Sequence, residues 1–175
     1  DNNALSLIYD FTLAIKSMNL KTDFEKLIVS NSGEIYIITR KSSFWDRSEV
    51  SGFSLIRIKN VSNIFLHQFS PESDKITDLF MDYDEKNERI VLAGFTTVND
   101  ESKANGYFGF SISGNDIPED AEIFVNKFTT DFISDVTGKK PGKVKELTDY
   151  KIQDIIVRND GGVIIISELV KEFTR

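Results

Sequence analysis

Residues 152–167 read IQDIIVRNDGGVIIIS, two apolar segments that are joined by a short polar turn. In the first segment an apolar residue is followed by two polar and three apolar residues, and the second segment is rich in isoleucine. β-Branched side chains in short runs, bordered by Asn, Asp and Gly, are typical of β-strands. The turn Asn159-Asp160-Gly161 contains residues that tolerate the left-handed backbone of tight hairpins. We therefore predict that the two segments pair as an antiparallel hairpin.

The same hairpin pattern occurs twice earlier in the chain, at residues 24–39 and 76–95. Asn31-Ser32-Gly33 connects the two segments of the first hairpin, and residues 84–88 connect those of the second. The second segment of each hairpin is almost continuously apolar, which is typical of strands that are buried on both faces. We therefore expect the central residues of these segments to be fully buried: Ile37, Leu92 and Ile165.

Two further apolar segments complete each repeat. One follows the hairpin, at residues 52–58 and 106–112, and the other ends in Phe, at residues 7–11, 65–69 and 124–128. The segments that end in Phe start 58 and 59 residues apart. We expect their last residues to occupy equivalent places on equivalent strands: Phe11, Phe69 and Phe128.

We name the two segments of each hairpin A and B, the segment that follows the hairpin C, and the segment that ends in Phe D. Their order along the chain is D, A-B-C-D, A-B-C-D and A-B. Repeats of four antiparallel strands are typical of β-propellers. We predict an all-β fold, a β-propeller-like array of four-stranded antiparallel blades with two complete blades plus parts of others. The alternative is a β-sandwich whose strands resemble each other only because buried strands are rich in Ile and Phe.

We expect residues 1–175 to form a single propeller-like repeat region. Its blade units lie at about 24–69, 76–128 and, incomplete, 152–175. Closed propellers have about four to eight blades, which is more than these units supply. We therefore expect a fragment of a larger propeller, with the remainder of its own parent chain as a partner; the alternatives are an artificial chain boundary or disorder.

Composition excludes several classes of function. The chain has 28 acidic and 21 basic residues, a net charge of −7, which is unfavourable for binding nucleic acid. It has no Cys and a single His, His67, which we expect to be partly exposed on an outer strand. Thiolate metal sites and two-histidine mechanisms are thereby excluded, and we expect no cofactor and no metal site. No apolar run approaches the ~18 residues of a membrane-spanning helix, so we expect no membrane insertion.

The candidate binding face is the end of the array at which the longest connections emerge. Because antiparallel strands alternate in direction, the B-C and D-A connections lie at one end, and loops on a rigid frame commonly carry function. A Trp beside an Arg is typical of binding hot spots, although the alternative is that the Trp caps the end of the fold. Three Lys lie in the turn at residues 138–143, which either binds an anion or is simply solvated. The candidate binding residues are Trp45, Asp46, Arg47, Asn99, Asp100, Lys139 and Lys140.

Residues 151–168, KIQDIIVRNDGGVIIISE, resemble the blade core of uncharacterised bacterial envelope proteins with β-propeller-like repeats. The resemblance implies a repeat architecture and a secreted or periplasmic location, and it carries no catalytic residues. We therefore expect a non-catalytic scaffold or interaction module of the bacterial cell envelope, which binds a protein or glycan through its B-C and D-A loops. The alternative is a propeller-type hydrolase acting on a glycan, in which Glu168 would need a second carboxylate as partner.

Overall fold

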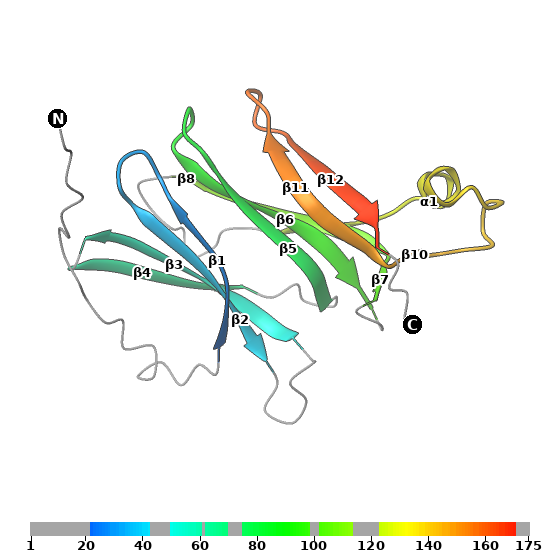
Figure 1. Ribbon diagram of the computed structural model, residues 1–175, viewed down its shortest axis with the longest axis horizontal. Helices are drawn as coiled ribbons and strands as arrows, with labels where there is room; N and C mark the ends of the chain where they lie inside the picture. Colours follow the sequence, from blue (N-terminus) through cyan, green and yellow to red (C-terminus); the bar gives the residue numbers. More distant parts are fainter. Residues whose placement is uncertain are drawn as a thin grey trace.

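Three antiparallel β-structures follow one another along the chain and across the molecule (Figure 1). The computed structural model describes residues 22–42, 50–60, 62–69, 75–98, 102–113 and 123–170. Within these ranges the chain is mostly β-strand, with one short helix, so the predicted all-β class is confirmed.

The first sheet is a four-stranded meander with the strand order β1-β2-β3-β4. Its strands are β1 (Thr22–Val29), β2 (Ile35–Ser42), β3 (Val50–Asn60) and β4 (Asn63–Phe69). The second sheet has the order β5-β6-β8-β9. Its strands are β5 (Lys75–Asp84), β6 (Arg89–Thr97), β8 (Gly106–Ser113) and β9 (Phe124–Lys127).

The third structure is a hairpin of β11 (Tyr150–Val157) and β12 (Val163–Leu169). Between it and the second sheet, the chain forms α1 (Thr130–Thr137) and the short strand β10 (Leu147–Thr148), which pairs with β7 (Lys103–Ala104).

All three predicted hairpins are present, and they share one register. In each, the ladder shifts at the second residue of the sequence motif, at Glu25 in β1, Thr77 in β5 and Gln153 in β11. A β-bulge of this kind inserts one extra residue into a strand and bends that strand locally. Because the bulges coincide, each residue of one hairpin has a defined equivalent in the other two.

The hairpin turns explain where these strands reverse. Gly33 and Gly161 have φ values of 85° and 92°, the left-handed backbone that glycine adopts without steric cost. The middle hairpin has no glycine in its turn, and there Glu88 adopts a positive φ of 47°. Asp84 supports this turn, because its carboxylate accepts hydrogen bonds from Asn87 and Arg89.

The Phe residues that end the fourth segments have matching positions where the structure describes them. Phe69 pairs with Phe53 in the β3–β4 ladder. Phe128 directly follows Lys127, the last paired residue of β9, and its N–H donates to the carbonyl of Asn105 (3.0 Å). Phe69 and Phe128 therefore each lie one residue beyond a strand pair that is equivalent in the two sheets, so their positions are equivalent. Phe11 lies outside the described residues.

Two hydrophobic cores lie between the three β-structures. The first core joins the first and second sheets, and it includes Tyr36, Ile38, Met81 and Leu92. The second core joins the second sheet to the β11–β12 hairpin and α1, and it includes Ala93, Phe95, Ile133, Ile152 and Ile155. Alternate residues of β6 thus enter different cores, which buries this strand on both faces.

Burial of the three central residues differs from the sequence prediction. Leu92 is fully buried, as predicted, but Ile37 and Ile165 are only half-buried, and the prediction is wrong for these two. Leu92 is fully buried because β6 has a packed structure on each face. Ile37 shares its face of the first sheet with the exposed Leu27 of the edge strand β1, whereas Ile165 packs against the second core beside an open cavity.

The connection at residues 129–151 contains more structure than the predicted loop. Thr129 caps α1, since its hydroxyl oxygen accepts the N–H of Phe132, and Gly138 ends the helix in the left-handed conformation. Ile133 anchors the helix in the second core. This packing stabilises a helix whose eight residues are too few to be stable alone.

Candidate functional site

Most of the sequence-predicted binding residues lie outside the part of the chain that the structure describes. These are Trp45, Asp46, Arg47, Asn99 and Asp100. Lys139 and Lys140 are described, and both are exposed just beyond α1. The carbonyl of Lys139 accepts a hydrogen bond from Ser134 Oγ (2.6 Å), which holds the turn against the helix.

Two of the long connections do meet at one end of the molecule. Strand β7 lies in the connection at residues 96–105, and its partner β10 lies in the connection at residues 129–151. Leu147 pairs with Ala104, and the N–H of Asp149 donates to the carbonyl of Ser102 (2.9 Å). These described parts of the B-C and D-A connections therefore form one continuous surface.

An open cavity of about 260 Å³ lies at this end, between the second sheet, α1 and the β11–β12 hairpin. We call it the aromatic pocket. It is lined by Phe95, Tyr107, Phe128, Phe132, Val136, Leu147, Tyr150, Val163, Ile165 and Ser167.

Phe128 organises the aromatic side of this pocket. Its ring lies edge-on to Phe95 with 5.8 Å between ring centroids, and it stacks on Phe132 at 5.0 Å. Tyr107 approaches the same ring at 5.7 Å. Offset and edge-on ring contacts of this kind are the favourable ones, so these packed rings form a preformed wall. Phe132 remains partly exposed at the surface.

The lining of the aromatic pocket sets its chemistry. Its polar side-chain groups are the hydroxyls of Tyr107, Tyr150 and Ser167, and no charged residue is among the lining residues. Apolar walls with a few hydroxyls bind an apolar or aromatic group, but they supply neither an acid and base pair nor metal ligands. Sequence reasoning missed this pocket because it treated Phe95, Phe128 and Leu147 as separate strand or loop residues.

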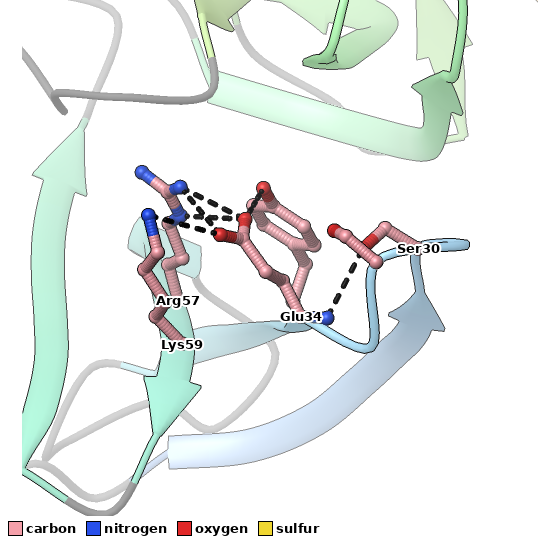
Figure 2. Close-up of polar contacts among 6 residues, drawn as sticks. Ser30, Glu34, Arg57 and Lys59 are labelled. Carbon is pink, nitrogen blue, oxygen red and sulfur yellow. Dashed lines mark hydrogen bonds and ion pairs between the residues drawn. The ribbon is translucent and has the colours of Figure 1, made fainter.

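A buried charged cluster lies in the first sheet at the β1–β2 turn (Figure 2), and none of its residues lines the aromatic pocket. Arg57 Nη2 lies 2.9 Å from Glu34 Oε1 and 2.8 Å from Oε2, and its Nε donates to Oε2 as well (3.1 Å). The hydroxyl of Tyr36 donates to Oε2 (2.7 Å), and Lys59 Nζ lies 3.7 Å from Oε1. Both oxygens of Glu34 therefore have hydrogen-bond or ionic partners.

The surroundings of Glu34 keep its carboxylate charged. Burial by itself raises the pKa of Glu34, but hydrogen bonds from Arg57 and Tyr36 and the charges of Arg57 and Lys59 lower it overall. A carboxylate with a lowered pKa and occupied oxygens is a poor general acid, so the cluster is structural. The sequence signal was Arg57, a charged residue within the apolar segment FSLIRI.

Acid should remove the stability that Glu34 contributes. Its folded pKa lies below the unfolded value of about 4.3, so the contribution is present above that pH and is lost as the pH falls through the folded pKa. We expect the free energy of unfolding to fall more steeply below pH ~4 in the wild type than in Glu34→Gln, which cannot titrate there. Urea melts of both proteins at a series of pH values around 4 test this prediction. The same pH dependence of the free energy of unfolding in the two proteins would contradict it.

The remaining candidates are isolated. Glu168 is exposed on β12 opposite Lys151, and it does not line the aromatic pocket. His67 is half-buried on the edge strand β4, as predicted, and burial lowers its pKa. Its ring stacks on Phe110 at 5.5 Å, as expected of a packing residue. Across the described ranges, no group of three or more His, Asp or Glu is placed to hold a metal ion.

No known family, curated protein or solved structure matches this chain. Among the residues described, no helix has the length and apolar character needed to cross a membrane.

Proposed function

We propose that this chain is a non-catalytic interaction module that binds a partner protein at the aromatic pocket. The observation that carries the proposal is the pocket itself, an open apolar cavity built where the B-C and D-A connections meet. Loops held on a rigid frame are common binding sites. The location that we propose, in the bacterial cell envelope, rests on the resemblance of residues 151–168.

The proposed frame is an array of propeller-like blades. Three hairpins with the same bulge support it, as do two sheets with the same order of four strands. The first strands of the three units are neighbours, since β5 contacts both β1 and β11. Such an arrangement is expected when repeated sheets are set around an axis.

A protein partner fits the pocket better than a glycan does. A cavity of about 150 Å³ already holds a benzene ring, so a cavity of about 260 Å³ has room for a large aromatic side chain. Sugars carry many hydroxyls, whereas the lining supplies only three side-chain hydroxyls and no carboxylate. The same lack of carboxylates leaves the glycan hydrolase without support from this pocket.

Blocking the pocket should abolish peptide binding. Val136 lines the pocket and is 38% exposed, so Val136→Arg should fold normally while placing a charged side chain at the opening. We expect peptides that were selected on the wild-type protein for an aromatic anchor to bind this variant at least about tenfold more weakly. Fluorescence anisotropy with labelled peptides measures the dissociation constants.

The matched control is Val170→Arg, because Val170 is also 38% exposed but does not line the pocket. This variant should bind the peptides like the wild type. Equal binding to both variants would contradict the proposal, as would selection of glycan fragments in place of peptides.

A further inference from the structure

Strand β12 has one edge without a strand partner in the described part of the chain. In the first two sheets the second strand of the hairpin is an interior strand, because β2 also pairs with β3 and β6 also pairs with β8. The equivalent strand β12 pairs with β11 alone, and it is the outer strand of the hairpin in Figure 1. We call its other side the free edge. Unpaired N–H and C=O groups along such an edge can take up a further strand.

The side chains of β12 are much more exposed than those of β6. Ile164 and Ile166 are 47% and 42% exposed, whereas Ala93 and Phe95, at the equivalent positions of β6, are 2% and 4% exposed. On the other face of β12, three residues line the aromatic pocket: Val163, Ile165 and Ser167. The free edge therefore has apolar surface on both sides, and the aromatic pocket lies beside it.

The second sheet shows which side chain of an added strand would face this pocket. In β8, Phe110 lies opposite Leu92, and its ring stacks on Phe69 with 5.4 Å between ring centroids. The shared hairpin register makes Leu92 equivalent to Val163. The ends of the fourth strands make Phe69 equivalent to Phe128. A side chain opposite Val163 would therefore face Phe128 in the aromatic pocket, as Phe110 faces Phe69.

The third strands of the two complete sheets define the kind of segment that fits the free edge. Residues 54–58 of β3 read SLIRI, and residues 106–110 of β8 read GYFGF at the equivalent ladder positions. Each begins with a small residue and has large apolar side chains at its second, third and fifth positions. Paired in the same register, such a segment lies opposite residues 163–167, with its fifth residue opposite Val163. The pocket of about 260 Å³ has room for an aromatic ring at that position.

We propose that the partner protein binds as an added β-strand, which pairs antiparallel with the free edge of β12 and inserts an aromatic side chain into the aromatic pocket from the position opposite Val163. This inference rests on the proposed function, and it adds the conformation of the partner segment and the place of its anchor. In such complexes main-chain hydrogen bonds give affinity, and pockets for alternate side chains give specificity. The partner segment has a small residue, large apolar residues at its second and third positions, and an aromatic residue at its fifth.

A labelled peptide with the sequence of residues 103–113, KANGYFGFSIS, is the probe, because it has the small residue and the aromatic fifth residue. We expect it to bind the wild-type protein with a Kd below about 1 mM in fluorescence anisotropy. Phe110→Ala in the peptide removes the anchor and should weaken binding at least about tenfold. Tyr107→Ala in the peptide is the matched control, because side chains alternate along a strand and this one points away from the pocket. It should weaken binding less than about threefold.

Amide hydrogen exchange of the protein distinguishes an added strand from insertion of a side chain alone. Successive N–H groups of a strand point to alternate edges of that strand. Saturating peptide should therefore slow the exchange of alternate amides of β12 at least about tenfold, because these N–H groups gain a partner. The amides of β12 that already pair with β11 should change less.

The outcomes separate this inference from the proposed function. Slower exchange at alternate amides of β12, together with the loss of affinity in the Phe110→Ala peptide, supports both. Peptide binding that Val136→Arg abolishes but that leaves the exchange of β12 unchanged supports the pocket and overturns the added strand. Equal binding of the two alanine peptides overturns the anchor opposite Val163. A KANGYFGFSIS peptide that does not bind also overturns the added strand, whereas peptides selected for an aromatic anchor still test the pocket by itself.

Discussion

Replacing Glu34 by alanine is expected to lower the free energy of unfolding by about 3 to 5 kcal/mol, the usual cost of removing one partner from a buried ion pair. Arg57 is only 2% exposed and Glu34 is 8% exposed. In the variant, the guanidinium loses both oxygens of its partner, and the hydroxyl of Tyr36 loses its acceptor. The loss of a carboxylate from a buried guanidinium is far more costly than a broken surface contact.

Denaturant melts at pH 7 measure this loss, and Glu25→Ala is the matched control. Glu25 forms an ion pair with Arg40 (2.5 Å) in the same sheet, but both side chains are partly exposed. An exposed pair contributes about 0 to 1 kcal/mol, so this variant should stay close to the wild type. Losses of the same size in the two variants would show that the Glu34 carboxylate is solvated and not buried.

Truncating Leu92 to alanine is expected to lower the free energy of unfolding by about 2 to 5 kcal/mol, because it leaves a cavity in the first core. Leu92 is 0% exposed at the centre of β6, with the first sheet on its side of the strand and the second core behind it.

The same truncation at the equivalent strands should cost less. Ile37→Ala and Ile165→Ala remove side chains that are half-buried, so we expect each to cost roughly half of the Leu92→Ala loss. Denaturant melts of the three variants under the same conditions measure the losses. Equal losses at all three positions would mean that Ile37 and Ile165 are fully buried, against the described burial.

The local sequence pattern was enough to predict the strands and their pairing. Runs of β-branched side chains and turns such as Asn31-Ser32-Gly33 act within a few residues, so the three hairpins follow from local preferences. The equivalence of Phe69 and Phe128 was also visible, because a repeat in sequence preserves its ladder register. In the candidate site, the pattern predicted that the B-C and D-A connections share one end, which β7 and β10 confirm.

Only the tertiary structure decided which side chains meet. The aromatic pocket joins Phe95, Phe128 and Tyr150, which are distant in sequence, and α1 forms because Ile133 packs in the second core. Glu34 and Arg57 are 23 residues apart, and their ion pair depends on a ladder that places Arg57 beside Tyr36. An apolar strand sequence shows that a strand can be buried, but burial on one face or two depends on how many layers pack against it. That number is a property of the assembled sheets, since a similar apolar run is buried in β6 and half-exposed in β12.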